Sequence, residues 1–112
     1  MTVREGALQF VACPTISAAL DARFLAFDKE GRVAAEPILK KGAPSQWPDV
    51  SRNDLIRDVK EALYAAKICS YAQGMNLIRA ASEANNWNVN LGECARIWKG
   101  GCIIRAKFLD LI

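Results

Sequence analysis

The chain has 112 residues, of which 52% are hydrophobic and 24% are charged, and its formal net charge is +3. This length gives one domain with one core, and the apolar fraction excludes an intrinsically disordered chain. A dedicated nucleic-acid-binding protein usually carries a dense basic face, whereas acidic and basic residues alternate along this chain. We therefore expect a single globular domain over residues 1–112 that binds no nucleic acid.

The sequence contains no apparent membrane-spanning segment and no apparent secretory signal. No apolar run approaches the roughly eighteen residues that a membrane helix needs. The N-terminal MTVREGALQF does not have the basic-then-apolar order of a secretory signal. These features predict a cytoplasmic protein that does not interact with membranes.

Histidine is absent, and the four cysteines are Cys13, Cys69, Cys94 and Cys102. The commonest general base and metal ligand is therefore missing. The cysteines form no C-x-x-C pair, so a zinc site would need all four thiolates at an unusual spacing. We expect reduced, mostly buried cysteines and no metal site.

Two or three helices are expected before the first loop. Thr2–Phe10 has apolar residues at helical spacing, and Pro14 should separate it from a second helix over residues 15–27. Gly31 is expected to break this second helix. Arg32–Leu39 then either continues it or forms a short helix of its own.

The clearest loop is Lys40–Val50, which contains one glycine and two prolines. Trp47 in this loop either packs on the body of the domain or contacts a partner. We favour packing on the body.

The longest predicted element is one helix within Ser51–Trp87, a stretch with no proline and a single glycine, Gly74. Ser51 is a suitable N-cap, and Asn85-Asn86 is a suitable stop. Such a helix would be roughly 54 Å long, whereas a compact chain of this size is only about 35 Å across. Either the helix breaks, near Gly74, or its exposed flank packs against something outside this chain. The mismatch indicates part of a larger assembly.

The C-terminal part is also expected to be helical. Asn90 should cap a helix over Leu91–Trp98, with Ile97 and Trp98 facing the core. Gly100-Gly101 then interrupts the chain, and Cys102–Ile112 should form a last helix. No run of period two indicates a strand, so the predicted fold class is all-α, organised around one long helix.

The residue pattern alone reveals no active site. Arg23 lies on a mostly apolar helix, where an arginine usually covers apolar neighbours and more rarely binds an anion. Lys67 shares a helix face with Tyr64 and Tyr71 and is more often a surface lysine than a catalytic one. Gly100-Gly101 lacks the G-x-G-x-x-G spacing of a dinucleotide-binding turn.

Three blocks have irregular, recognisable sequences. They are PTISAALDARFLAF over Pro14–Phe27, YAAKICSYAQGMNLIRAASE over Tyr64–Glu83, and LGECARIWKGGCIIRAKFL over Leu91–Leu109. In order and spacing these blocks resemble the 6-phosphogluconate dehydrogenase family. The resemblance implies an interior fragment of that family's all-helical C-terminal domain.

The same resemblance implies the function. The family is an NADP-dependent, cytosolic, homodimeric oxidoreductase of the pentose phosphate pathway that needs no metal. It oxidatively decarboxylates 6-phosphogluconate to ribulose 5-phosphate and CO2. Its nucleotide-binding domain and its catalytic lysine and glutamate correspond to segments absent here. We therefore expect this chain to supply substrate binding and dimer-interface helices, to hold no NADP and to be inactive alone. The alternative is a non-catalytic helical interaction module.

One site residue is implied by the resemblance. In the family, the arginine of an F-A-R-x-L stretch contacts the substrate's phosphate. The matching residues here are Asp21-Ala22-Arg23-Phe24-Leu25, with Asp21 in place of the aromatic residue. A guanidinium suits this role because it binds phosphate oxygens bidentately and stays charged. Arg23 is thus the predicted substrate-binding residue, whereas Lys99 and Arg105 have no assigned ligand contact.

Overall fold

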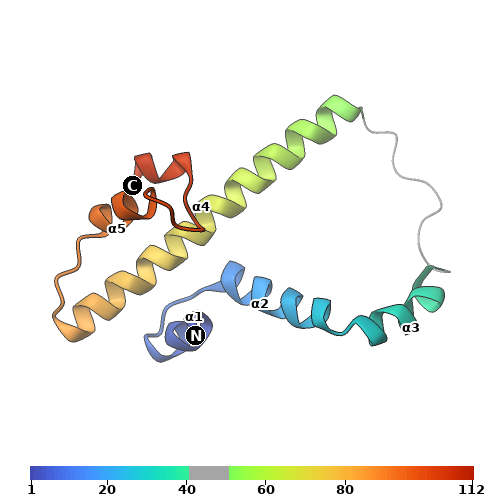
Figure 1. Cartoon of the computed structure of the whole chain (residues 1–112), viewed down its shortest axis with the longest axis horizontal. Helices are drawn as coiled ribbons and strands as arrows, with labels where there is room; N and C mark the ends of the chain where they lie inside the picture. The colour runs from blue at the N-terminus through green and yellow to red at the C-terminus, as the bar shows by residue number, and fades with distance from the viewer. Residues whose placement is uncertain (41–50) are drawn as a thin grey trace. The chain divides into compact units, whose positions relative to one another are not determined.

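The computed structural model describes residues 1–40 and 51–112. Within these ranges the chain is helical and contains no strand, which confirms the all-α prediction (Figure 1). Apart from Lys40, the predicted loop Lys40–Val50 and its Trp47 lie outside the described residues. None of the described helices is both long and apolar enough to cross a membrane. The elements are α1 (Thr2–Leu8), α2 (Pro14–Phe27), α3 (Lys29–Leu39), α4 (Arg52–Asn85), α5 (Leu91–Trp98) and the 3-10 helix η2 (Lys107–Leu111).

The break between α2 and α3 lies at Asp28 and not at Gly31, so that prediction is wrong. The Asp28 carboxylate accepts a hydrogen bond of 2.9 Å from the backbone N–H of Gly31 and caps α3. A Cβ atom at Gly31 would clash with this carboxylate, so the glycine leaves room for the cap. On the other side of the corner, the Arg32 guanidinium donates to the carbonyl oxygen of Ala26 at 3.0 Å. The corner between α2 and α3, at Asp28, is therefore stabilised by one hydrogen bond to Gly31 in α3 and one to Ala26 in α2.

The predicted long helix is confirmed as α4, which continues without a break for 34 residues. It begins directly after Ser51, whose carbonyl oxygen accepts from the Leu55 N–H at 3.0 Å. It ends where Asn86 takes up a left-handed backbone conformation with φ of 57°, as the Asn85-Asn86 signal predicts. Gly74 does not interrupt it. The helix is about 51 Å long.

The described residues form two compact units, and α4 contributes to both. Unit 1 comprises Met1–Ala12 and Ala72–Ile112, and unit 2 comprises Cys13–Tyr71. The expectation of a single domain over residues 1–112 stays a prediction.

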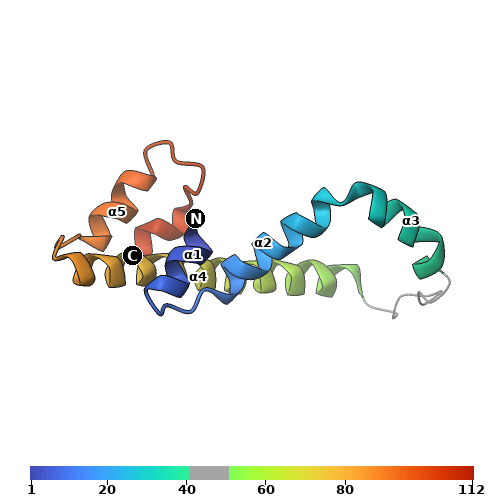
Figure 2. The same cartoon turned by 90° about the horizontal axis from the view of Figure 1, so that it is seen from below.

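Unit 1 has a small core between α1, the C-terminal half of α4, α5 and η2. After α4 the chain turns back, so that α5 and η2 lie beside the C-terminal half of α4 (Figure 2). The Asn90 side chain accepts from the Glu93 N–H at 3.0 Å, which confirms the predicted cap of α5. The buried residues are Gly6, Met75, Leu77, Ser82, Ala95 and Leu109.

Two predictions about the C-terminal part are wrong. Ile97 is 58% exposed, because α5 turns Ala95 into the core, where its exposure is only 1%. Cys102–Ile112 forms only the short helix η2, preceded by turns and an extended Ala106. The adjacent β-branched Ile103 and Ile104 disfavour helix at this point. Lys99 instead pairs with Asp110 and holds the returning segment in place.

Unit 2 is built from α2, α3 and the N-terminal half of α4. The hydroxyl groups of Thr15 and Ser70 lie 3.1 Å apart and join the start of α2 to α4. Beyond this contact, α2 leads away from α4 (Figures 1 and 2). Cys13 is buried, but neither α2 nor α3 contains a buried residue.

The cysteines are free thiols, as expected for a reduced protein. They are not mostly buried, however. Cys69 is exposed, and Cys94 and Cys102 are half-buried, so only Cys13 fits that part of the prediction. Among the described residues, no group of three or more acidic or cysteine side chains is placed to hold a metal ion.

Candidate functional site

Arg23 lies in the third turn of α2. Pro14 begins this helix at a position where its missing N–H costs nothing, and the apolar run that follows continues it to Phe27. Arg23 is exposed, as are its neighbours Phe24 and Leu25. No carboxylate of the described residues forms an ion pair with its guanidinium. Within residues 1–40 and 51–112, the donor groups of Arg23 are therefore not engaged by a carboxylate.

The surroundings of Arg23 on α2 are mostly apolar. Residues three or four positions apart share a helix face, which places Leu20 and Phe27 beside Arg23. Phe27 is 78% exposed. Asp21 lies two positions away on a different face. An anion that reached Arg23 would thus meet one arginine at the edge of an apolar surface.

The other basic residues singled out in the sequence have different environments. Lys67 is exposed on α4 in unit 2, and no ion pair within the described part of the chain involves it. Lys99 and Arg105 belong to unit 1. Lys99 pairs with Asp110, and the Arg105 guanidinium donates to the carbonyl oxygen of Cys102 at 3.1 Å. These two side chains stabilise the C-terminal segment.

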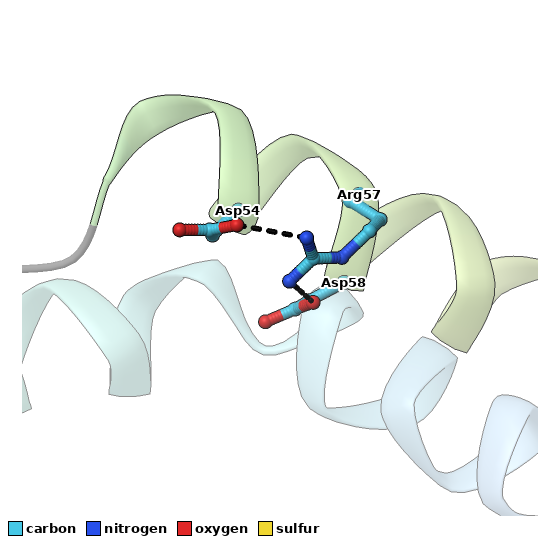
Figure 3. A network of polar contacts seen from close by, with 3 residues as sticks. All are labelled: Asp54, Arg57 and Asp58. Carbon is cyan, nitrogen blue, oxygen red and sulfur yellow. Dashed lines mark hydrogen bonds and ion pairs between the residues drawn. The ribbon is translucent and has the colours of Figure 1, made fainter.

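The structure adds a polar network that the sequence reading missed. In the first turns of α4, Arg57 lies 2.8 Å from Asp54 and 3.4 Å from Asp58 (Figure 3). The sequence spacing could have predicted the Asp54–Arg57 pair, because residues three positions apart share a helix face. All three side chains are at least half exposed, so the network contributes little stability, about 0–1 kcal/mol per pair.

A second feature missed from the sequence is a hollow in unit 1 around Arg79. It has a volume of about 440 Å³ and is lined by polar Gln73, Asn76 and Arg79 above the apolar Met75 and Leu91. Arg79 donates to the Asn76 side-chain oxygen at 2.5 Å. A neighbouring hollow of about 500 Å³ also borders Arg79. Ser82 and Glu83 also line the second hollow, where the Ser82 hydroxyl oxygen accepts a hydrogen bond of 2.8 Å from the Val89 N–H. Arg23 lines neither hollow.

Comparison with known proteins identifies the family. The family model described as "6-phosphogluconate dehydrogenase, C-terminal domain" matches residues 1–112, which is the whole chain. The chain belongs to this family. The resemblance inferred from the three sequence blocks is thereby confirmed.

Individual relatives of the 6-phosphogluconate dehydrogenase family agree with this. The chain is 57% identical over 111 residues to "6-phosphogluconate dehydrogenase, decarboxylating 1" of Oryza sativa subsp. japonica, covering 99% of this chain and 23% of that protein. It is 56% identical over 115 residues to the rice "decarboxylating 2, chloroplastic" protein, with coverages of 99% and 23%. It is 53% identical over 109 residues to "6-phosphogluconate dehydrogenase, decarboxylating" of Synechococcus elongatus, with coverages of 96% and 23%. The chain spans about a quarter of the length of these curated relatives, and no solved structure matches it significantly.

The 6-phosphogluconate dehydrogenase residues described here do not fit a dinucleotide cofactor. A dinucleotide site needs a strand, a glycine-rich turn and a helix, so that the pyrophosphate meets the helix N-terminus. No strand occurs within residues 1–40 and 51–112. Gly100-Gly101 instead forms a turn after α5, with a φ of 113° at Gly101. No step of the chemistry is therefore assigned to NADP on this chain.

Proposed function

We propose that this chain is the part of a decarboxylating 6-phosphogluconate dehydrogenase that positions the substrate's phosphate group, with Arg23 as its contact. The observation that carries the proposal is the whole-length family match together with an exposed Arg23 that has no carboxylate partner in the described residues. The overall reaction is the oxidation and decarboxylation of 6-phosphogluconate to ribulose 5-phosphate and CO2. In this proposal the redox step belongs to other parts of the subunit.

Phosphate binding by Arg23 serves catalysis without touching the reacting carbon atoms. A guanidinium offers paired N–H donors that match two phosphate oxygens and remains charged throughout the physiological pH range. Binding energy from the phosphate end of the substrate holds the reacting end in place, which lowers the entropic part of the barrier. Arg23 is thus proposed as a positioning residue for the reaction and not as an acid or base.

The proposal assigns NADP to a part of the subunit outside this chain. The described residues do not fit the cofactor. We therefore propose that the isolated chain does not oxidise 6-phosphogluconate. The location in the cytoplasm stays a prediction, since one of the rice relatives is named chloroplastic.

We also propose that helices of unit 2 take part in a homodimer of the complete enzyme. The support is the large number of exposed apolar side chains on this unit, among them Phe24, Phe27, Val59 and Leu63. Phe24 and Phe27 share one face of α2, and Val59 and Leu63 share one face of α4. Exposed apolar helix faces are typical of interfaces. A non-catalytic interaction module could use the same surface. A measurement of enzymatic activity therefore has to distinguish that module from a part of the enzyme.

A chimeric enzyme tests the catalytic function. The matched segment of the rice "decarboxylating 1" relative is replaced by these 112 residues, and NADPH formation with 6-phosphogluconate is measured. We expect turnover by the chimera and none by the isolated chain. A folded chimera that neither binds nor turns over 6-phosphogluconate would favour the interaction module. Turnover by the isolated chain would overturn the proposed division of labour.

A further inference from the structure

A second arginine lies beside the helix turn that carries Arg23. Arg32 is in α3, and its guanidinium donates to the carbonyl oxygen of Ala26 in α2 at 3.0 Å. Ala26 follows Arg23 by three positions, and residues with this spacing share a helix face with their Cβ atoms about 5–6 Å apart. The hydrogen bond therefore holds the positive charge of Arg32 about one helical turn from the backbone of Arg23.

The carboxylates nearest to Arg32 in the sequence do not neutralise its charge. Asp28 and Glu36 lie four positions before and after Arg32, a spacing that favours ion pairs along a helix. The Asp28 carboxylate instead accepts from the Gly31 N–H at 2.9 Å, and Glu36 forms its ion pair with Lys40. No carboxylate within the described part of the chain forms an ion pair with Arg32.

The exposed Arg32 side chain also retains donor groups beyond its bond to Ala26. A guanidinium has five N–H groups, and the bond to Ala26 uses one of them. The bond also places the guanidinium at the C-terminal end of α2, where the helix dipole stabilises a positive charge. Arg32 thus combines a held position with a full charge and several N–H donors.

A phosphate group suits a pair of arginines better than a single one. A phosphate monoester carries a charge of about −1.5 to −2 at pH 7 and three acceptor oxygen atoms. One guanidinium supplies a single positive charge and binds at most two of these oxygen atoms in its bidentate geometry. A phosphate bound to Arg23 alone would therefore keep about half of its charge and at least one oxygen atom without a partner on this chain.

We infer that Arg32 binds the phosphate group of the substrate together with Arg23, so that two guanidinium groups beside the corner between α2 and α3 hold one dianion (Figure 2). The inference rests on the proposed function and deepens it by naming a second binding residue. In this arrangement Arg23 approaches the phosphate from the last turns of α2, and Arg32 approaches it from the first turn of α3.

Kinetics of the chimeric enzyme test the inference. Arg32→Gln removes the charge but keeps a side-chain N–H group that can still donate to the carbonyl oxygen of Ala26. We expect KM for 6-phosphogluconate to rise by about tenfold or more, because a hydrogen bond to a charged group is lost. Inorganic phosphate, used as a competitive inhibitor, should bind more weakly to this variant by a similar factor.

A matched control separates binding from the overall charge of the corner. Lys29 is exposed at the start of α3, and no hydrogen bond or ion pair in the described ranges ties it to α2. Lys29→Gln removes the same charge as Arg32→Gln and should leave KM for 6-phosphogluconate essentially unchanged. Arg32→Lys keeps the charge without the planar donor geometry, so its KM should lie between those of the unchanged chimera and Arg32→Gln.

A double variant distinguishes direct binding by Arg32 from an effect on the backbone of Arg23. If Arg32 contacts the phosphate, Arg23→Ala/Arg32→Gln should have a KM at least about fivefold above that of Arg23→Ala alone. If Arg32 acts only through Arg23, the two variants should have the same KM, because nothing is left to position. Equal values would overturn the inference.

Two further outcomes would also overturn it. One is an unchanged KM in Arg32→Gln, and the other is an equal rise in KM for Lys29→Gln. Circular dichroism checks that the helical content of each chimera is unchanged, and Arg32→Lys provides the comparison if Arg32→Gln disturbs the fold. A raised KM in Arg23→Ala beside an unchanged KM in Arg32→Gln would leave the proposed function standing, whereas unchanged values in both would remove it as well.

Discussion

Replacement of Arg23 by alanine in the chimeric enzyme is the sharpest test of the proposed site. The side chain is exposed and has no ion pair among the described residues, so its loss should leave the fold intact. A hydrogen bond to a charged group contributes about 1.5–3 kcal/mol. Since each 1.4 kcal/mol corresponds to a factor of ten, KM for 6-phosphogluconate should rise by about 10- to 150-fold.

The assay measures NADPH formation over a range of 6-phosphogluconate concentrations. Arg23→Lys keeps the charge but loses the bidentate geometry, so its KM should lie between those of the unchanged chimera and Arg23→Ala. The matched control is Arg52→Ala, at another exposed arginine of unit 2 that forms no ion pair in the described ranges. Circular dichroism checks that the helical content of each variant is unchanged.

Gluconate, which lacks the phosphate, separates a phosphate contact from a general loss of activity. We expect poor turnover of gluconate by the chimera, and Arg23→Ala should not lower it further, because the deleted contact is absent with this substrate. The reasoning would be refuted by an unchanged KM for 6-phosphogluconate in Arg23→Ala. An equal rise in KM for Arg52→Ala would refute it too, since the effect would then reflect net charge alone.

Three further predictions concern stability and activity. Gly74→Ala should stabilise the isolated chain by about 1 kcal/mol in urea unfolding, because a Cβ atom there meets no described atom within 4 Å; a destabilised variant would show that another backbone approaches this glycine. Asn90→Ala should cost about 1 kcal/mol in the same assay, since it removes the cap on the Glu93 N–H, whereas Asn90→Asp should retain most of that stability. The purified chain should form no NADPH from 6-phosphogluconate, and measurable turnover would contradict the assignment of the redox step to other parts of the subunit.

The parts of the fold that the sequence predicted correctly depend on local chemistry. Asn90 caps α5, and Asn85-Asn86 ends α4, because side-chain capping and left-handed backbone are decided by a few adjacent residues. The errors occur where two local signals compete or where distant contacts decide. Asp28 ends α2 before Gly31 can do so, because its carboxylate supplies the cap of the next helix. Cys102–Ile112 forms only η2 because the β-branched Ile103 and Ile104 disfavour helix, and the Lys99–Asp110 pair adds a contact from outside the segment.

The candidate site was less accessible to sequence reasoning than the fold. The composition of α2 gave no reason to prefer Arg23 over other surface arginines, and only the family resemblance assigned it a ligand. Arg79 was missed because it lies inside an ordinary helical pattern, and the hollow beside it forms only when the chain folds back after α4. The chemistry of such surfaces depends on which segments meet, which residue spacing alone does not specify.

The corner between α2 and α3 has a consequence for a residue that it does not touch. Arg23 stands one turn before the end of α2, where a helix terminus normally frays. Here the Asp28 carboxylate caps α3, and the Arg32 guanidinium donates to the carbonyl oxygen of Ala26 in the final turn of α2. In the proposed phosphate-binding role of Arg23, these two hydrogen bonds restrain the backbone that carries the guanidinium, so less conformational entropy would be lost when a ligand binds.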